Sequence, residues 1–341
     1  MGELLRTLLL VAVGLAVFFA AIALLYWLAS QFREPMRERA RTLVFVGPAM
    51  LLLIGGLIYP AIKTVILAFY KGPVPDKWAG LENFKSLFTN HDNLLVLRNN
   101  LWWAILATVV STAMGVLIAR LADRMRGEPI AKALIFLPTA ISMVGAGIVW
   151  RFVYANGGNN INKQFGLLNY VWVKLDPILP GKQTPQFWLQ NNTFFGLKSS
   201  WLPGMNTVFL IVIFIWIQAG FATVVISAAM KGVPDDLVEA AKIDGATDRQ
   251  AFFRIVIPYI RPTIITVATT TVIAVLKVFD IVQATTGGLF DTNVLANDMY
   301  TKSFTQGLPG YGAALAVVLF IAVIPIVFIN ARNQKSLREG A

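Results

Sequence analysis

The sequence lacks cysteine altogether and has a single histidine, His91, among its 341 residues. A disulfide framework, a thiol nucleophile and an iron–sulfur site are therefore excluded, and so is a metal site built from several histidines. Charged residues are also scarce. They make up 14% of the chain, whereas a soluble domain carries about 25%. This scarcity rules out a soluble enzyme.

Hydrophobic residues, by contrast, make up 57% of the chain. They gather in runs of about twenty, long enough for a helix to cross a hydrocarbon core of roughly 30 Å. The sequence therefore predicts an all-α polytopic membrane protein with about seven transmembrane helices. The expected spans are 8–29, 43–70, 98–119, 133–154, 205–229, 263–281 and 312–329. The first span could instead be a cleaved signal peptide, but it is longer than a usual signal core and ends at the interfacial pair Tyr26 and Trp27.

The formal net charge of +11 would fit nucleic-acid binding, but it also fits lysine and arginine held at the cytoplasmic ends of spans. The short connections 30–42 and 120–132 each hold four such residues. Short loops decide orientation under the positive-inside rule. We therefore expect a multi-pass protein of the cytoplasmic (inner) membrane in contact with lipid, and no nucleic-acid partner. Its N-terminus lies outside, and residues 333–341 form a cytoplasmic tail.

The connection 231–262 is the most informative part of the chain, because five basic and five acidic residues are interleaved there with apolar ones. Pro234 and the acidic residues after it favour a helix start, and Gly245 can take the left-handed conformation that ends a helix. The spacing predicts a short helix over 235–244. Thr247 and Gln250 have the spacing of a capping box for a second helix, which Pro258 bends or ends.

The first of these two helices carries a stripe of residues at i, i+3, i+4 and i+7. The stripe consists of Leu237, Ala240, Ala241 and Asp244. The two alanines allow another backbone to come close. The sequence leaves two interpretations open: a surface hairpin packed on its own protein, or a helix that docks into a groove of a cytoplasmic partner.

The connection also resembles the EAA loop of permease subunits of binding-protein-dependent ABC importers. The matching residues are Val233 to Leu237, Glu239-Ala240-Ala241, Asp244-Gly245-Ala246, Gln250, Phe252, Ile255, Ile257-Pro258 and Pro262. Ile257 stands where the family usually has Leu. Segments 150–154, 276–282, 286–288 and 314–324 look like the maltose and α-glucoside permeases, the α-glucoside type in particular.

This resemblance implies an ABC type I importer transmembrane fold over 43–332, with the EAA loop at 231–262. The segment 1–42 is then an extra N-terminal helix and cytoplasmic linker. The family implies a second homologous permease subunit, two ATP-binding cassette ATPases and an extracytoplasmic solute-binding protein as partners. The chain has no G-x-x-x-x-G-K-[ST] loop. It is therefore expected to be no enzyme and to bind no cofactor or metal, ATP and Mg being used by the ATPases.

In the family, the ATPase-coupling residues sit on the first helix of the loop. The resemblance assigns this role to Leu237, Glu239, Ala240, Ala241, Asp244 and Gly245. Closure of the ATPases on ATP would push the helix as a rigid lever and switch the flanking spans between inward and outward states.

The family holds its sugar between the spans that flank this loop. Gln218, Phe221 and Thr271 lie at the corresponding levels and can supply polar partners and an aromatic surface. Threonine in a helix often bonds its own i−4 carbonyl instead. Lys277 and Asp280 are ionisable groups in the sixth span, which makes them further substrate candidates or a self-satisfied pair on one helical turn.

The segment 155–203 contains Trp172, Trp188 and Trp201, which indicate either interfacial anchoring or a docking surface for the solute-binding protein. The expected function is import of a sugar, an α-glucoside or another di- or oligosaccharide. The alternative is an ATP-independent channel or an ion-coupled sugar carrier, which would need intramembrane acidic residues and leaves the EAA-like loop without a purpose. No motif of a membrane-embedded enzyme is present.

Overall fold

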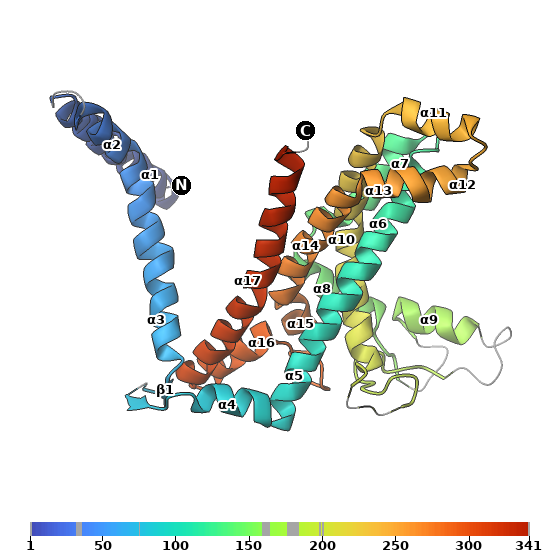
Figure 1. Ribbon diagram of the computed structural model, residues 1–341. Coiled ribbons are helices and arrows are strands. Elements are labelled where there is room, and N and C mark those ends of the chain that lie inside the picture. The colour runs from blue at the N-terminus through green and yellow to red at the C-terminus, as the bar shows by residue number, and fades with distance from the viewer. Residues whose placement is uncertain are drawn as a thin grey trace. The chain divides into compact units, whose positions relative to one another are not determined.

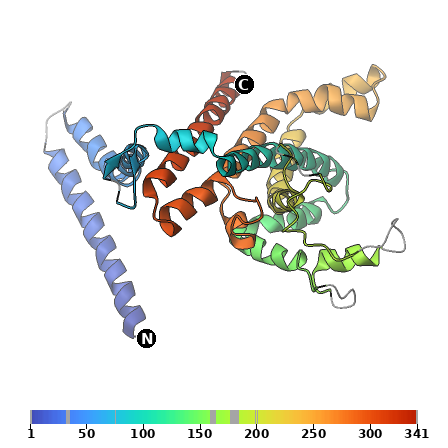
Figure 2. The same ribbon diagram turned by 90° about the horizontal axis from the view of Figure 1, so that it is seen from below.

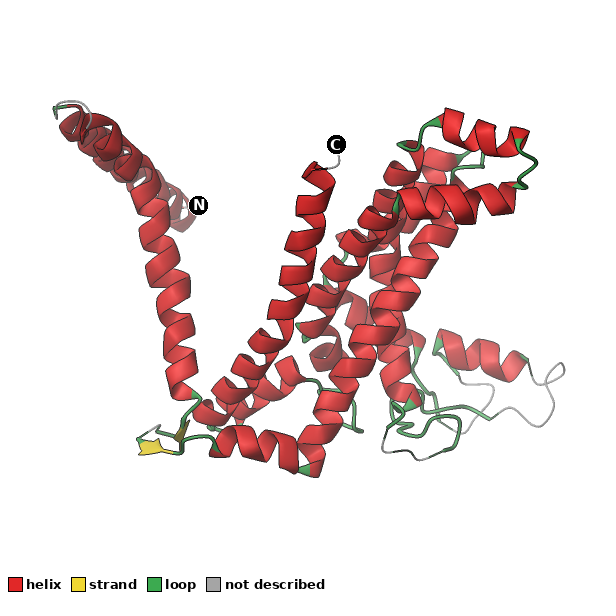
Figure 3. Ribbon diagram, viewed as in Figure 1, coloured by secondary structure: helices red, strands yellow, loops and turns green. Residues whose placement is uncertain are grey.

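The computed structural model describes residues 2–31, 36–74, 76–158, 164–175, 184–197, 199 and 201–339. The chain divides into two compact units, Met1–Ile66 and Leu67–Ala341. Apart from one small two-stranded ribbon, the described residues form helices and loops (Figure 3). This confirms the all-helical class expected from the apolar runs.

The first unit is built from long apolar helices. They are α1 (Gly2–Ser30), α2 (Met36–Leu53), the π-helix η1 (Ile54–Ile58) and α3 (Tyr59–Leu67), whose last residue belongs to the second unit. α1 and α2 pack against each other. The ring of Tyr26 meets Phe45 edge-on at 5.7 Å, and the Arg41 guanidinium lies 5.3 Å from the centre of the same ring. Arg33, counted among the cytoplasmic arginines, lies outside the described residues.

The second unit begins with the ribbon β1 (Tyr70–Lys71) and β2 (Lys77–Trp78), which pair antiparallel. Its first helices are α4 (Glu82–Thr89), α5 (His91–Trp102), η2 (Trp103–Ala107), α6 (Thr108–Ala122), α7 (Glu128–Phe136), η3 (Leu137–Ala140), α8 (Met143–Val153) and α9 (Leu167–Lys174). Then follow α10 (Met205–Lys231), α11 (Asp235–Ile243), α12 (Asp248–Ala251), η5 (Phe252–Val256), α13 (Ile257–Tyr259), α14 (Arg261–Leu276), α15 (Asp280–Thr285), α16 (Leu295–Tyr300), η6 (Thr301–Thr305) and α17 (Pro309–Glu339).

Helix α10 is the centre of this unit. It packs against α6, α7, α8, α14 and α15, and Figure 2 shows it (yellow) surrounded by neighbouring helices. Small residues let the backbones approach: a β-carbon added at Gly115 of α6 would collide with Ala222 of α10, and one at Gly220 would collide with the backbone of α7. The largest core cluster includes Trp103, Phe214 and Ile281. Close packing on several sides makes α10 a rigid axis.

Five helices are long and apolar enough to cross a membrane, and the number rises to seven if each of two bent helix pairs is one span. The predicted spans 8–29, 98–119, 205–229 and 312–329 each fall within one of the five long helical segments. The predicted span 43–70 falls almost entirely within a fifth, Glu38–Leu67. Seven crossings is therefore the upper figure for the described residues.

The predicted span 133–154 is not one straight helix. It bends by 100° between Glu128–Ala140 and Met143–Val153. Pro138 lies in the 3₁₀ turn η3 before the bend, and the Ser142 hydroxyl accepts a hydrogen bond from Gly145 N–H to cap α8. A proline and a fresh helix cap therefore break the apolar run, a feature that hydrophobicity alone does not register.

The predicted span 263–281 also needs correction, because α14 ends at Leu276 and α15 begins only at Asp280. At its other end α14 meets α13 at an angle of 65°. Most residues of α14 are β-branched, and these have low helix propensity. Local preference alone therefore does not account for this helix, although Pro262 in its first turn favours a helix start there.

Candidate functional site: the α11–α13 hairpin

Helix α11 ends as the sequence predicts, at a glycine in the left-handed conformation. Gly245 has φ +86°. Its N–H bonds Lys242 O at 3.0 Å and the next N–H, of Ala246, bonds Ala241 O at 2.9 Å. These two bonds form a Schellman motif, which reverses the chain directly after the helix. An added β-carbon would meet nothing within 4 Å. The need for glycine is therefore conformational rather than steric.

The second arm of the hairpin starts with the predicted capping box. Thr247 N–H donates to Gln250 Oε1 at 2.8 Å, and Gln250 N–H donates to Thr247 Oγ1 at 3.3 Å. The chain continues as α12, the π-helix η5 and α13, and bends at Ile260, two residues after Pro258. Proline lacks the N–H of a regular helix, and the bend carries the chain from the hairpin into α14.

Most of the predicted stripe on α11 is exposed. α11 has no buried residue. Leu237, Glu239, Ala240, Asp244 and Gly245 are exposed and Ala241 is half-buried. The opposite side of the helix makes the internal contacts, since Val238 packs on a cluster that includes Ile260. Ile243, at the end of the helix, is 86% exposed. The side chain of Ile243 therefore takes no part in packing within the chain.

The hairpin is fastened to the end of α6 by charged groups. The Arg120 guanidinium lies 3.8 Å from the centre of the Phe252 ring. Arg124 Nη2 lies 3.5 Å from Asp248 Oδ2, and Lys242 Nζ lies 3.2 Å from the other carboxylate oxygen of Asp248. Asp248 thus joins both arms of the hairpin to the segment that follows α6. This set was not predicted, because its members are far apart in the sequence.

Two of the predicted substrate residues bond each other. Gln218 Nε2, on α10, donates to Thr271 Oγ1, on α14, at 3.2 Å. Thr271 is buried, and its hydroxyl also donates to Val267 O at 2.8 Å. The i−4 bond expected for threonine therefore forms, and it occurs again at Thr223 and Thr269. Phe221, the third predicted residue, is half-buried on α10. The substrate role of these three side chains stays a prediction.

Lys277 and Asp280 do not share a helical turn, contrary to the sequence expectation. Lys277 caps the end of α14, and Asp280 is the first residue of α15. Phe279 between them has the non-helical angles φ −135° and ψ −55°. Among the described residues neither side chain forms an ion pair. The break in the helix separates them, so the self-satisfied pair is wrong for this conformation.

A group of buried asparagines was missed at the opposite end of the second unit. Asn99 Nδ2 donates to Asp291 O at 2.6 Å and to Asn293 O at 2.9 Å, and Asn206 Nδ2 donates to Phe290 O at 2.6 Å. Phe290 and Asp291 have positive φ, +58° and +60°. Such strained residues persist only where their surroundings hold them. The signal available in the sequence was the pair Asn99-Asn100 at the start of an apolar run.

The tryptophans of 155–203 divide between core and surface. Trp172 and Trp188 meet edge-on at 5.6 Å, and Trp188 packs on Phe209 of α10. Trp201 is 80% exposed. Residues 159–163, 176–183, 198 and 200 of this predicted docking surface lie outside the described residues.

Within the part of the chain that is described, no group of three His, Asp or Glu side chains could hold a metal ion.

The second unit is thus a helical bundle with an exposed, glycine-terminated helix next to its central helix, and the comparisons identify its class. Residues 111–339 match the family "Binding-protein-dependent transport system inner membrane component". The chain is 42% identical to the "Osmoprotective compounds uptake permease protein GgtC" of Synechocystis over 293 residues, which are 86% of this chain and 98% of the relative. It is also 42% identical to the "Alpha-glucoside transport system permease protein AglF" of Rhizobium meliloti over 294 residues, 86% of this chain and 82% of the relative.

The fold is also that of a solved importer. A bacterial alginate ABC transporter in complex with alginate pentasaccharide-bound periplasmic protein has a TM-score of 0.66 at 22% identity, over 86% of this chain and 93% of the matched chain. The chain therefore belongs to the binding-protein-dependent transport family. It is the multi-pass inner-membrane permease subunit of an ABC importer, which works with a binding protein and ATPase subunits, and it is not itself catalytic.

Proposed function

We propose that this permease imports a sugar of the α-glucoside class, and the observation that carries the proposal is the 42% identity to an α-glucoside permease across 86% of the chain. The structure is consistent with a polyhydroxylated solute. The amide of Gln218 and the hydroxyl of Thr271 already bond each other between the two helices that flank the hairpin. A sugar hydroxyl could exchange with either group, and Phe221 on the same helix offers an aromatic surface.

A second solute class has equal support. The relative described as an osmoprotective compounds uptake permease is also 42% identical and is matched over 98% of its length. The two proposals are separated by binding and uptake measurements on the reconstituted importer with its own binding protein. A panel of α-glucosides and osmoprotective solutes is offered in turn. Preference for α-glucosides supports the first proposal, and uptake of osmoprotectants alone supports the second.

For the coupling step, we propose that α11 docks in a cleft of one ATPase subunit, with Glu239 and the alanine stripe in contact and Gly245 forming the turn behind them. The exposure of Leu237, Glu239, Ala240 and Ile243 supports this role. A second, homologous permease completes the transmembrane part, and ATP and Mg are used by two ATPases. Lys277, at the end of α14, and Asp280, at the start of α15, are retained as further substrate contacts because both are ionisable groups in the predicted sixth span.

The proposed orientation places the hairpin in the cytoplasm. Figure 1 shows α11, α12, the start of α7 and the C-terminal end of α17 at one end of the second unit, with α4 and α9 at the other. Arg120 and Arg124 contact the hairpin, and arginines on this side are what the positive-inside rule requires of a cytoplasmic face. The C-terminus is then cytoplasmic. The segment 155–203 is external, where it is proposed to meet the binding protein.

A further inference from the structure

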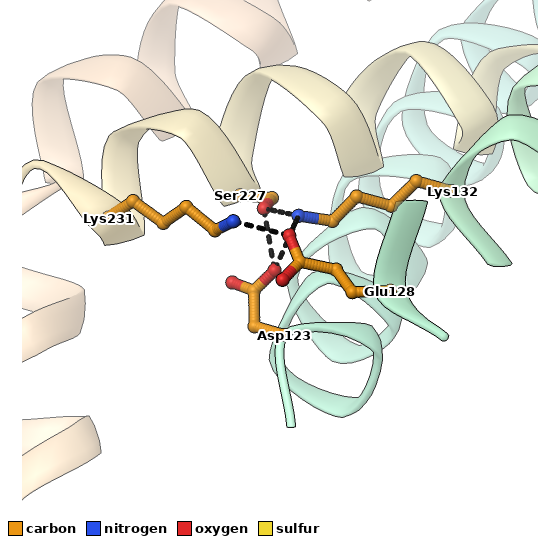
Figure 4. Close-up of polar contacts among 5 residues, drawn as sticks. All are labelled: Asp123, Glu128, Lys132, Ser227 and Lys231. Carbon is orange, nitrogen blue, oxygen red and sulfur yellow. Dashed lines mark hydrogen bonds and ion pairs between the residues drawn. The ribbon is translucent and has the colours of Figure 1, made fainter. Parts of the chain in front are cut away.

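Four charged side chains and a serine lie close together where α10 ends and the hairpin begins. We refer to Asp123, Glu128, Lys132, Ser227 and Lys231 as the junction cluster (Figure 4). Lys132 Nζ lies 2.6 Å from Asp123 Oδ1 and 2.6 Å from Glu128 Oε1. These three side chains are only 15% to 22% exposed. An ammonium group held between two partly buried carboxylates is a specific arrangement, because the positive charge is paired on both sides.

The cluster joins two parts of the chain that are about a hundred residues apart. Asp123 belongs to the connection between α6 and α7, and Glu128 and Lys132 are on α7. Ser227 and Lys231 stand one turn apart on the last turns of α10. Ser227 Oγ donates to Asp123 Oδ1 at 2.7 Å and also contacts Lys132, while Lys231 pairs with Glu128. The last two turns of α10 are therefore bonded to the α6–α7 connection through Ser227 and to the first residue of α7 through Lys231.

The cluster lies at the point where a force on α11 would enter the bundle. Only residues 232–234 separate Lys231 from α11, and they are ordered: Gly232 N–H bonds Ala229 O at 3.1 Å and Val233 N–H bonds Met230 O at 3.2 Å. Val233 is buried. A displacement of α11 should therefore be transmitted to Lys231 through a short and ordered link.

The same α6–α7 connection also holds the other arm of the hairpin, through Arg124 and Asp248. The α6–α7 connection thus contacts α10, which precedes the hairpin, and α12, which belongs to its second arm. We propose that the junction cluster is a second coupling element: through Lys132 it makes the α6–α7 connection, α7 and the end of α10 move as one body with the hairpin. Lys132 is then a positioning residue for transport, and this role rests on the proposed docking of α11 on the ATPase.

If the ion pairs of the junction cluster are removed, the hairpin can still bind the ATPase and permit ATP hydrolysis. Its movement is then transmitted only to α10. The test is the amount of ATP hydrolysed per solute imported, measured on the complete importer with its binding protein in proteoliposomes. In Lys132→Met this ratio should rise about five-fold or more, the lower end of typical allosteric couplings. Lys132→Arg, which keeps the positive charge between the carboxylates, should restore most of the coupling. Lys85→Met, at an exposed position on α4, is the matched control and should leave the ratio unchanged.

Because Lys132→Met could assemble poorly, Glu128→Gln provides a second variant of nearly the same shape that removes the charge shared by Lys132 and Lys231. It too should raise the ratio. A parental ratio in both variants would overturn the proposal. Equal losses of hydrolysis and import, with the ratio unchanged and no rescue by Lys132→Arg, would also overturn it, since the cluster would then serve stability alone. Failure of the proposed function would look different: the parent complex itself would import solute without hydrolysing ATP.

Discussion

The side chains of Gln218 and Thr271 are bonded to each other, amide nitrogen to hydroxyl at 3.2 Å, across the contact between α10 and α14. These are the helices directly before and after the hairpin. A movement of the hairpin that separates these helices would break this bond. Under the proposed substrate role, the Gln218 amide and the lone pair of the Thr271 hydroxyl would then be free to bond a solute hydroxyl.

This bond leads to a first prediction, on solute recognition. Thr271→Val, which keeps the shape and removes the hydroxyl, and Gln218→Ala should each weaken solute transport by about 1–3 kcal/mol in apparent free energy, the cost of leaving a polar group unpaired. Thr271→Ser retains the hydroxyl and should stay close to the parent. Uptake kinetics of the assembled importer give the measurement. Parental kinetics in both Thr271→Val and Gln218→Ala would place the solute elsewhere.

A second prediction concerns the turn after α11. Gly245→Val forces a β-branched residue into a left-handed conformation, at a cost of about 1–2 kcal/mol or more. Since open space surrounds the position, Gly245→Asn should be better tolerated, because asparagine visits this conformation more readily. Co-purification of the ATPase with each variant should follow the order parent, Asn, Val. Equal loss in both variants would point to volume rather than backbone conformation.

A third prediction concerns Asp298, which lies in α16, outside the candidate spans. Burial raises the pKa of this carboxyl, opposed by the nearby charge of Lys302 and a hydrogen bond from Asn293. The folded state therefore holds the proton to higher pH than the unfolded state does. The stability that this group contributes is present at low pH and is lost as pH rises through its folded pKa.

Asp298→Asn removes the ionisation and keeps the shape. Its melting temperature in the purified complex should exceed that of the parent at neutral pH, and the difference should shrink toward the ordinary aspartate pKa of about 3.9. Lys302→Met serves as the companion variant. In the Lys302→Met background, Asp298→Asn should raise the melting temperature at neutral pH by more, because the Lys302 charge favours the carboxylate of Asp298. A melting temperature of Asp298→Asn below that of the parent at neutral pH would show that the ionised form is needed.

A fourth prediction tests orientation, and the absence of cysteine makes it direct. A single cysteine at Asn192 or Thr305 should react with an impermeant thiol reagent applied to intact cells. A cysteine at Arg249, exposed on the hairpin, should react only after the membrane is opened. Labelling of Arg249→Cys in intact cells would reverse the proposed topology.

Local features of the hairpin could be predicted because their determinants are adjacent in sequence. The start after Pro234, the left-handed Gly245 and the Thr247–Gln250 capping box all form as expected. The contacts of the hairpin with the end of α6 and those of the junction cluster were not predicted, because their members are far apart in the sequence. Asp123 and Ser227, for example, are 104 positions apart. Hydrophobicity likewise located the spans but not the breaks near Pro138 and after Leu276. Those depend on a single proline and on tertiary packing.

The central claim is that α11 couples transport to ATP hydrolysis in partner subunits. Its most direct test is uptake by the reconstituted importer with the parent chain and with Glu239→Ala, each with and without the ATPase. Only the parent with ATPase and ATP should accumulate solute, and Glu239→Ala should bind the ATPase poorly or hydrolyse ATP without transport. Full uptake by Glu239→Ala, or any uptake by the parent without the ATPase, would contradict the claim and favour a channel or an ion-coupled carrier.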